Sequence, residues 1–177
     1  MRTRGASRRA SASIGATSSS CVSRNPQRAY TDRAPAVFIS PRRVRFREME
    51  YAVPRAALPD VLREIDTWVN GSGETVSFPI EVRFAAPDDV WLSTGYERAN
   101  AYVAVHQYHQ TDYRRYFEGV EAIFGEHEGR PHWGKLHTLE PDTLRARYPR
   151  FDDFRSVRDR LDPQRTFANA YLDRVLG

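Results

Sequence analysis

A change in composition near residue 35 most constrains what this chain folds into. Residues 1–43 hold nine arginines and one acidic residue, a net charge of +8, whereas residues 44–177 carry a net charge of −4. Residues 1–29 are rich in Arg, Ser and Ala and lack apolar periodicity. Such a segment buries too little apolar surface to offset the entropy that ordering costs. We therefore expect a disordered tail over residues 1–35 and one folded domain over residues 36–177.

The basic tail has three interpretations. Its Arg-rich, Ser-rich and acid-poor composition is typical of a transit peptide. A basic arm for an anionic partner is a second interpretation. The one that we favour is a segment with no evolved role, translated from a start codon upstream of the true coding region. Because the folded region is itself mildly acidic, the sequence argues against a nucleic-acid-binding domain.

The size and composition fit one globular domain with a core. The chain has 177 residues, of which 40% are hydrophobic and 12% aromatic. No apolar run approaches the roughly 20 residues that a membrane-spanning helix needs, so we expect no transmembrane segment. The single cysteine, Cys21, excludes an internal disulfide and a thiolate metal cluster.

Apolar periodicity predicts an α+β fold. Alternation and short apolar runs predict strands at residues 37–39, 44–53, 75–85 and 99–109. Helical spacing predicts helices at residues 54–69, 113–124, 141–147, 151–160 and 168–175. Pro79, inside the third strand, implies a sheet edge or a bulge. The order predicts a mostly antiparallel sheet with helices on one face, followed by a helical C-terminal tail.

The octet Arg130–His137 (RPHWGKLH) contains the only lysine of the chain, Lys135. Arginine supplies the positive charge elsewhere, and lysine differs from it as a compact ammonium whose pKa moves readily on burial. A site that needs a point charge beside a developing alkoxide would favour lysine at this position. The alternative is a surface turn in an arginine-rich protein.

A second segment, residues 78–84 (FPIEVRF), places Glu81 and Arg83 on one face of a strand. A carboxylate and a guanidinium side by side can orient the hydroxyls of a polyol. The alternative, which these residues alone favour, is a solvent-facing ion pair of little energetic value. Ile80, Val82 and Phe84 are expected to point into the core.

The histidines do not predict a metal site. His106 shares a strand face with Tyr108 and is a candidate pocket residue, although a structural histidine is commoner. His132 and His137 are five residues apart, which is not the one-turn spacing of H-E-x-x-H. The sequence also lacks the Gly-x-Ser-x-Gly of esterases and a phosphate-cradling glycine loop. The residues alone therefore name no cofactor.

With these segments in view, the chain from about residue 30 to residue 177 resembles the C-terminal half of the sugar-lactone oxidase family. That family includes D-arabinono-1,4-lactone oxidase, L-gulonolactone oxidase and the alditol oxidases. The resemblance rests on the motifs Ser40–Arg42, Phe46–Pro54, Glu81–Phe84, Asp88–Ser93, Arg130–Lys135, Arg158–Pro163 and Phe167–Leu172.

The resemblance implies a flavoprotein in which an N-terminal domain binds FAD and a cap domain with an antiparallel sheet covers the flavin and binds the sugar. It implies catalytic roles for Glu81, Arg83 and Lys135, whose head groups are expected to converge on one concave wall. It implies substrate-binding roles for the pocket residues His106, His132 and Trp133. The FAD-binding residues are not assigned.

No flavin-binding domain is recognisable in the sequence, so we expect a C-terminal fragment of the family that is colourless and inactive by itself. The expected function is oxidation of an aldonolactone, or of a polyol, with an FAD-binding domain supplied by another chain. The alternative is a non-catalytic orphan cap domain with residual sugar binding or none. The resemblance implies a cytoplasmic location, with membrane association as in some family members as the alternative.

Overall fold

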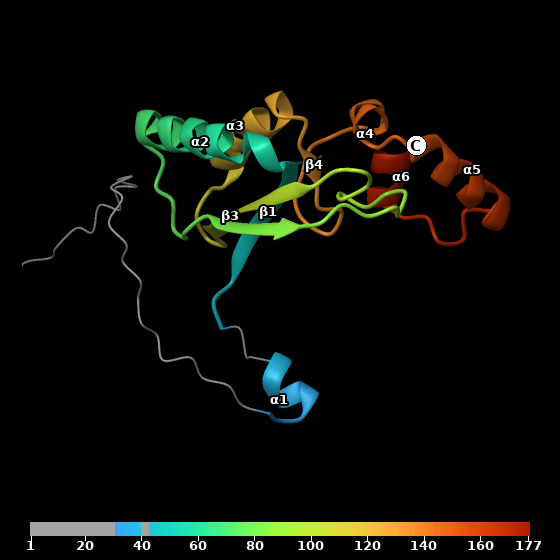
Figure 1. Cartoon of the computed structure of the whole chain (residues 1–177), viewed down its shortest axis with the longest axis horizontal. Helices are drawn as coiled ribbons and strands as arrows, with labels where there is room; N and C mark the ends of the chain where they lie inside the picture. Colours follow the sequence, from blue (N-terminus) through green and yellow to red (C-terminus); the bar gives the residue numbers. More distant parts are fainter. Residues whose placement is uncertain (1–30, 40–42) are drawn as a thin grey trace, which may run out of the picture. The chain divides into compact units, whose positions relative to one another are not determined.

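The computed structural model describes residues 31–39 and 43–177, and the contacts divide the chain into residues 1–42 and 43–177 (Figure 1). Most of the expected disordered tail, residues 1–30, lies outside the described residues. In the first unit α1 (Ala34–Phe38) replaces the short strand predicted at residues 37–39, and it begins inside the expected tail. The proline at its first turn explains the error, because Pro35 fits a helix start and its carbonyl accepts from Ile39 N at 3.0 Å.

The second unit contains a four-stranded sheet in the order β2-β3-β1-β4, and each adjacent pair of strands is antiparallel. The strands are β1 (Phe46–Pro54), β2 (Glu81–Ala85), β3 (Asn100–Tyr108) and β4 (Arg130–Pro131). The mostly antiparallel sheet is therefore confirmed, with β1 in its interior and β2 at one edge.

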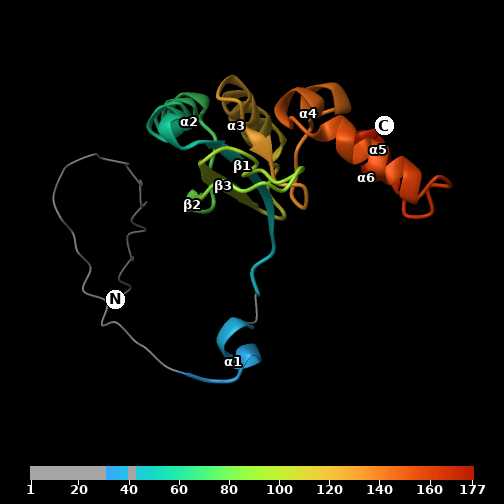
Figure 2. The same ribbon diagram turned by 45° about the vertical axis from the view of Figure 1, so that its right-hand side comes forward.

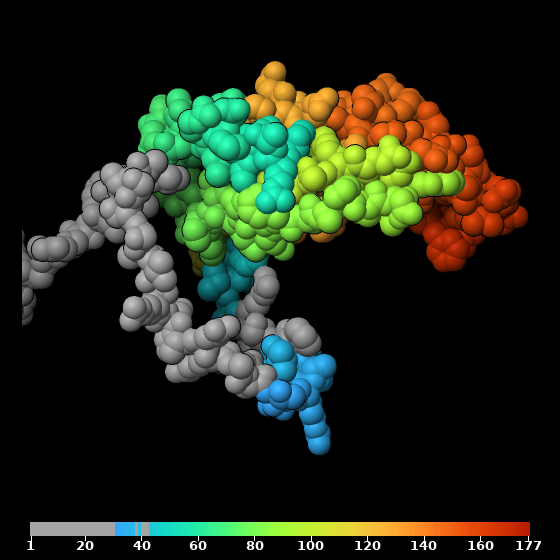
Figure 3. All heavy atoms as spheres, in the orientation of Figure 1, coloured from blue at the N-terminus to red at the C-terminus, as the bar shows by residue number. Residues whose placement is uncertain are grey.

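Two helices cover one face of this sheet, as predicted. A 3₁₀ turn, η1 (Arg55–Ala57), leads into α2 (Leu58–Ser72), and α3 (Arg114–Glu126) follows β3. The helices approach closely at Gly119, where a Cβ atom would lie 2.2 Å from the Trp68 ring. In the space-filling view, the atoms of α2 lie above the green segment that follows it in the chain (Figure 3). The main core lies between these helices and the sheet, and its buried members include Met49, Tyr51, Val53, Val61, Ile65, Val103, Val105, Tyr116, Val120 and Phe124.

The C-terminal tail is helical, as predicted, and has its own apolar cluster. It comprises α4 (Pro141–Arg147), α5 (Phe151–Leu161) and α6 (Ala170–Leu176), which are grouped together in Figure 2. The second cluster consists of Leu144, Tyr148, Phe151, Val175 and Leu176. None of the helices within the described ranges has the length and apolarity needed to cross a membrane.

The predicted strand at residues 75–85 is shorter in the structure, because only Glu81–Ala85 joins the sheet. The backbone of the preceding residues is bound instead by the fully buried side chain of Gln107. Its Nε2 donates to Thr75 O at 2.8 Å, and its Oε1 accepts from Ser77 N at 3.3 Å. The expectation that Phe84 enters the core is wrong. Its side chain is 55% exposed and lies under the Arg55 guanidinium, because β2 is the edge strand that the helices leave uncovered.

The two faces of the sheet therefore differ sharply. Met49, Tyr51 and Val53 of β1 point toward the helices and are buried. Side chains alternate along a strand, so Glu48 and Glu50 point to the opposite, helix-free face.

Candidate active site

Charged residues of the helix-free face form one group, here called the sheet-face cluster. They come from three strands and from the turn after β4, and they are linked by ion pairs. The cluster consists of Glu48, Glu50, Glu81, Arg83, His106 and Lys135.

Glu50 is the centre of this cluster. Its Oε2 atom accepts from Arg83 Nη2 and also from Lys135 Nζ, the latter at 2.7 Å. The Glu50 side chain is only 4% exposed. Removing a carboxylate from water is costly unless it is paired and hydrogen-bonded, and two cations on one oxygen satisfy that requirement.

Arg83 and Glu81 form the open end of the cluster. Arg83 Nε lies 3.4 Å from Glu81 Oε1, and the side chains are 50% and 51% exposed. Arg83 is therefore anchored at one end by buried Glu50 and accessible at the other. Such a pair presents both a carboxylate acceptor and guanidinium donors to a ligand on the sheet.

Glu48 connects Lys135 to His106 at the other end. Its Oε1 lies 2.5 Å from Lys135 Nζ and 3.2 Å from His106 Nε2. Burial raises the pKa of Glu48, but the Lys135 ammonium and the His106 imidazole outweigh that effect and hold this pKa below its ordinary value. Glu48 is therefore ionised at neutral pH and helps to fix the ammonium.

The segment after β4 explains how Lys135 reaches the sheet. His132 N donates to Glu50 O at 2.9 Å, and Leu136 N donates to Glu48 O at 3.0 Å, so this segment follows β1. Between these two bonds the chain turns, with Lys135 N donating to His132 O at 3.0 Å. The His132 ring supports the turn, because its Nδ1 accepts from Gly134 N at 3.1 Å. The turn extends Lys135 over the two carboxylates.

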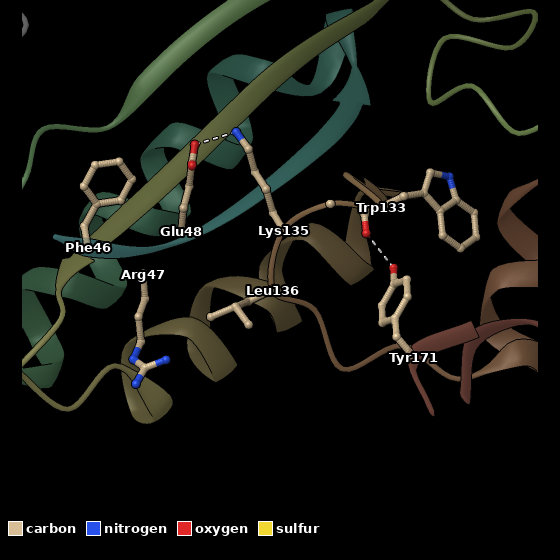
Figure 4. Close-up of a pocket in the computed structure, with 8 residues that line it drawn as sticks. Phe46, Arg47, Glu48, Trp133, Lys135, Leu136 and Tyr171 are labelled. Atoms are coloured by element: carbon tan, nitrogen blue, oxygen red, sulfur yellow. Dashed lines mark hydrogen bonds and ion pairs between the residues drawn. The ribbon is translucent and has the colours of Figure 1, made fainter. Parts of the chain in front are cut away.

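Trp133 points elsewhere. Its Nε1 donates to Leu92 O at 3.0 Å, and its ring centroid lies 5.1 Å from that of Tyr148 in the second apolar cluster. Figure 4 shows the indole turned away from Lys135. Of the six residues predicted for the site, four lie in the sheet-face cluster, whereas His132 supports the turn that carries Lys135 and the Trp133 indole packs against Tyr148.

An open pocket of about 510 Å³ adjoins one end of the cluster (Figure 4). This volume is within the range of small-molecule sites. Its lining residues are Phe46, Arg47, Glu48, Trp133, Gly134, Lys135, Leu136 and Tyr171. Glu81 and Arg83 lie outside this lining, so the three predicted head groups share a sheet face while only Lys135 borders the hollow.

Glu48 and Glu50 are missing from the residues predicted from the sequence. The signal for them was nevertheless present, because they flank Met49 in a strand that continues with the apolar residues Tyr51–Val53. A carboxylate at such a position needs a buried partner, and here the partners are far away in the chain.

The described residues show neither a glycine-rich diphosphate loop after a strand nor a cluster of metal ligands. The connections from β1 to α2 and from β3 to α3, residues 54–57 and 109–113, contain no glycine. Neither connection therefore has the glycine-rich sequence of a diphosphate-binding loop. In this part of the chain, no three His, Cys, Asp or Glu side chains gather as metal ligands.

Comparison with known proteins decides the family. The sequence model of the D-arabinono-1,4-lactone oxidase family matches residues 6–175. The chain belongs to the D-arabinono-1,4-lactone oxidase family. The resemblance seen in the sequence motifs is thereby confirmed.

Three relatives illustrate the match of this D-arabinono-1,4-lactone oxidase family member. L-gulono-1,4-lactone dehydrogenase of Mycobacterium tuberculosis is 52% identical over 146 residues, covering 82% of this chain and 34% of the relative. L-gulonolactone oxidase of Bos taurus is 34% identical over 131 residues, covering 71% and 30%. Alditol oxidase of a Streptomyces species is 37% identical over 136 residues, covering 73% and 31%. The chain spans about a third of the length of these relatives.

Proposed function

We propose that this chain forms the substrate-binding part of an FAD-dependent oxidoreductase that oxidises an aldonolactone. The observation that carries this proposal is the position of Glu50, whose single buried oxygen holds both Arg83 and Lys135 on an open sheet face. The family membership and the names of the relatives support the lactone as the substrate class.

Hydroxyl groups of the substrate are proposed to bind at the open end of the cluster. The half-exposed Glu81 carboxylate accepts from ligand hydroxyls, and the half-exposed Arg83 guanidinium donates to ligand oxygens. Hydrogen bonds that involve an ionised partner are stronger than neutral ones. Two such groups on neighbouring positions of one strand would fix the orientation of a polyhydroxylated ring.

Lys135 and Arg83 are proposed to stabilise the oxygen of the reacting carbon. A hydroxyl that loses its proton during oxidation develops negative charge, and two preorganised cations favour that charge. A preorganised donor of this kind contributes roughly 3 kcal/mol to the transition state. FAD is proposed to be held by a flavin-binding domain outside the described residues, on this or another chain, which would bring its redox chemistry to the bound sugar.

A second candidate function is an orphan cap domain that binds sugars without catalysis, since the half-exposed Glu81–Arg83 pair offers hydrogen-bonding groups to a sugar without a cofactor. Both functions require the sheet-face cluster to bind a lactone. They differ only in whether a flavin can be brought to the bound sugar.

Lactone binding is tested on the purified full chain by NMR. The sole lysine gives one side-chain signal in a sample labelled at lysine, so Lys135 reports directly on the site. We expect L-gulono-1,4-lactone or D-arabinono-1,4-lactone to shift this signal together with amide signals of β1, β2 and β3. Arg83→Leu should weaken the effect, whereas Arg63→Leu, at an exposed position of α2, should not. No shift at saturating concentrations of either lactone contradicts both functions.

The two functions are separated by supplying the part that relatives have beyond the matched region. The chain is mixed with FAD and with the unmatched portion of the Mycobacterium tuberculosis relative, and reduction of an artificial electron acceptor by lactone is followed. Turnover that Lys135→Met abolishes, and that Arg63→Leu retains, supports the oxidoreductase. Lactone binding without any turnover supports the orphan cap domain.

A further inference from the structure

We propose that Glu50 makes the site selective for the neutral lactone over the open-chain aldonate anion. This inference rests on the proposed function and assigns Glu50 a specificity-determining role within it.

Both cations of the cluster are already committed to carboxylates of the protein. Arg83 pairs with Glu50 and Glu81, and Lys135 pairs with Glu48 and Glu50. Three carboxylates thus face two cations and one imidazole. The site offers hydrogen-bonding groups without a surplus of positive charge, which suits a polyol that binds uncharged and develops only partial negative charge beside the cations during the reaction.

Burial makes the charge of Glu50 felt across the cluster. Its side chain is 4% exposed, compared with 22% for Glu48 and 51% for Glu81. Water and salt screen buried charges less than exposed ones. A ligand carboxylate placed near Arg83 or Lys135 would therefore meet the unscreened negative charge of Glu50.

The negative charge of Glu50 can separate the lactone from its hydrolysis product. An aldonolactone adds water at its carbonyl carbon, the bond from that carbon to the ring oxygen breaks, and the product ionises to an aldonate. Lactone and aldonate carry the same remaining hydroxyls but differ by one negative charge. Hydroxyl contacts alone separate them poorly, whereas a repulsive element against the anion separates them well.

The test compares L-gulono-1,4-lactone with L-gulonate on the wild-type chain and on Glu50→Gln. Binding is followed at pH 7 through the signal of the sole lysine and by calorimetry. Gln keeps the shape of Glu while removing one unit charge within a few ångströms of the cations. We expect the affinity for gulonate relative to the lactone to rise at least about tenfold, and this gain should persist in high salt because a buried charge is weakly screened.

Two further variants control the test. Glu118→Gln, at an exposed position of α3, makes the same change in net charge away from the cluster and should leave the ratio unchanged. Glu48→Gln acts at the more exposed edge of the cluster and should raise the ratio in the same direction by a smaller factor. It carries the test if Glu50→Gln fails to fold.

The outcomes separate this inference from the proposed function. If the wild-type chain binds gulonate as tightly as the lactone, or if neither glutamine variant raises the ratio, the role of Glu50 is overturned while lactone binding stands. If the wild-type chain binds neither compound, the proposed function fails. In that case a gain of gulonate binding in Glu50→Gln still supports exclusion of anions by Glu50, and no gain overturns it.

Discussion

The Lys135 ammonium lies 2.7 Å from Glu50 Oε2, although 85 residues separate the two along the chain. Pairing of the 132–136 segment with β1 brings them together, and Arg83 reaches the same oxygen from β2. The two cations are therefore held by one carboxylate and change position together if it moves.

Replacing Lys135 by Met should reduce lactone binding more than folding. Glu50 keeps Arg83 as a partner in this variant, so we expect the free energy of unfolding to fall by only about 1–2 kcal/mol. Lactone affinity should fall at least about tenfold, because charge-assisted hydrogen bonds are lost. Urea unfolding and calorimetry measure the two quantities, and Lys135→Arg retains the charge as a control. Lactone binding by Lys135→Met at wild-type affinity would show that the assigned role is wrong.

Tyr51→Phe should destabilise the fold. The Tyr51 hydroxyl donates to Glu121, which is 8% exposed and also accepts from Thr138 N at 2.8 Å. Burial, together with the Glu121 carboxylate, raises the pKa of Tyr51 above its ordinary value, so the hydroxyl remains a donor. Loss of this donor should lower the free energy of unfolding by about 1–3 kcal/mol.

The control for this change is Tyr102→Phe. The Tyr102 hydroxyl lies 2.8 Å from Thr94 Oγ1 in a partly exposed position, where water can replace the bond. This variant should lose less stability than Tyr51→Phe in the same urea titration. Equal losses of unfolding free energy in the two variants would mean that the buried hydrogen bond to Glu121 stabilises the fold no more than the partly exposed one to Thr94.

Stability should fall between pH 6.5 and pH 4 because of His137. Burial, and next the Arg174 guanidinium, lower the pKa of His137 to about 4 from its ordinary value of 6.5. In this pH interval His137 is therefore protonated in the unfolded chain and neutral in the folded chain. The stabilisation is complete above pH 6.5 and is lost as the pH falls toward 4, by roughly 2 kcal/mol.

The measurement is urea unfolding at pH 7.5 and at pH 5. His137→Phe keeps an aromatic ring beside Tyr171 and Trp133 but cannot titrate. Its stability should change less between the two pH values than that of the wild-type chain. The same loss in both proteins would assign the pH dependence to other groups.

Phe84→Ala should cost less stability than Val103→Ala, although it removes a larger side chain. Phe84 is 55% exposed, and its loss mainly removes the contact with Arg55, which is worth about 0.5–1 kcal/mol. Val103 is fully buried in the main core, and truncating it should cost about 2 kcal/mol. Thermal unfolding of both variants ranks them, and the reverse order would place Phe84 in the core after all.

Local periodicity predicted most of the fold, because it records which face of an element is buried. The alternation around Met49 predicted β1, and the stripe from Leu58 to Val69 predicted α2. Periodicity predicted the wrong start for the strand at residues 75–85, because the distant Gln107 side chain binds the backbone carbonyl of Thr75. It also failed at Phe84, since the pattern does not say whether a strand lies at an edge.

The candidate site was predictable in part. Glu81, Arg83 and Lys135 were predicted from their residue types and motifs, and the structure places them on one sheet face. Glu50 was not found, because its importance comes from two contacts that no local pattern contains. The direction of the Trp133 indole likewise depends on the second apolar cluster, which forms only after the C-terminal helices pack.

The placement of β2 at the margin of the sheet has a consequence for the range of sugars. Glu50 belongs to β1, which is held by a neighbour on each side, whereas Glu81 and Arg83 belong to a strand bonded on one side only. The backbone at Glu50 is therefore held by more neighbours than the backbone at Glu81 and Arg83. Under the proposed function, lactones that differ in length or stereochemistry should be accommodated by small displacements of β2, while Glu50 keeps its position beside Lys135.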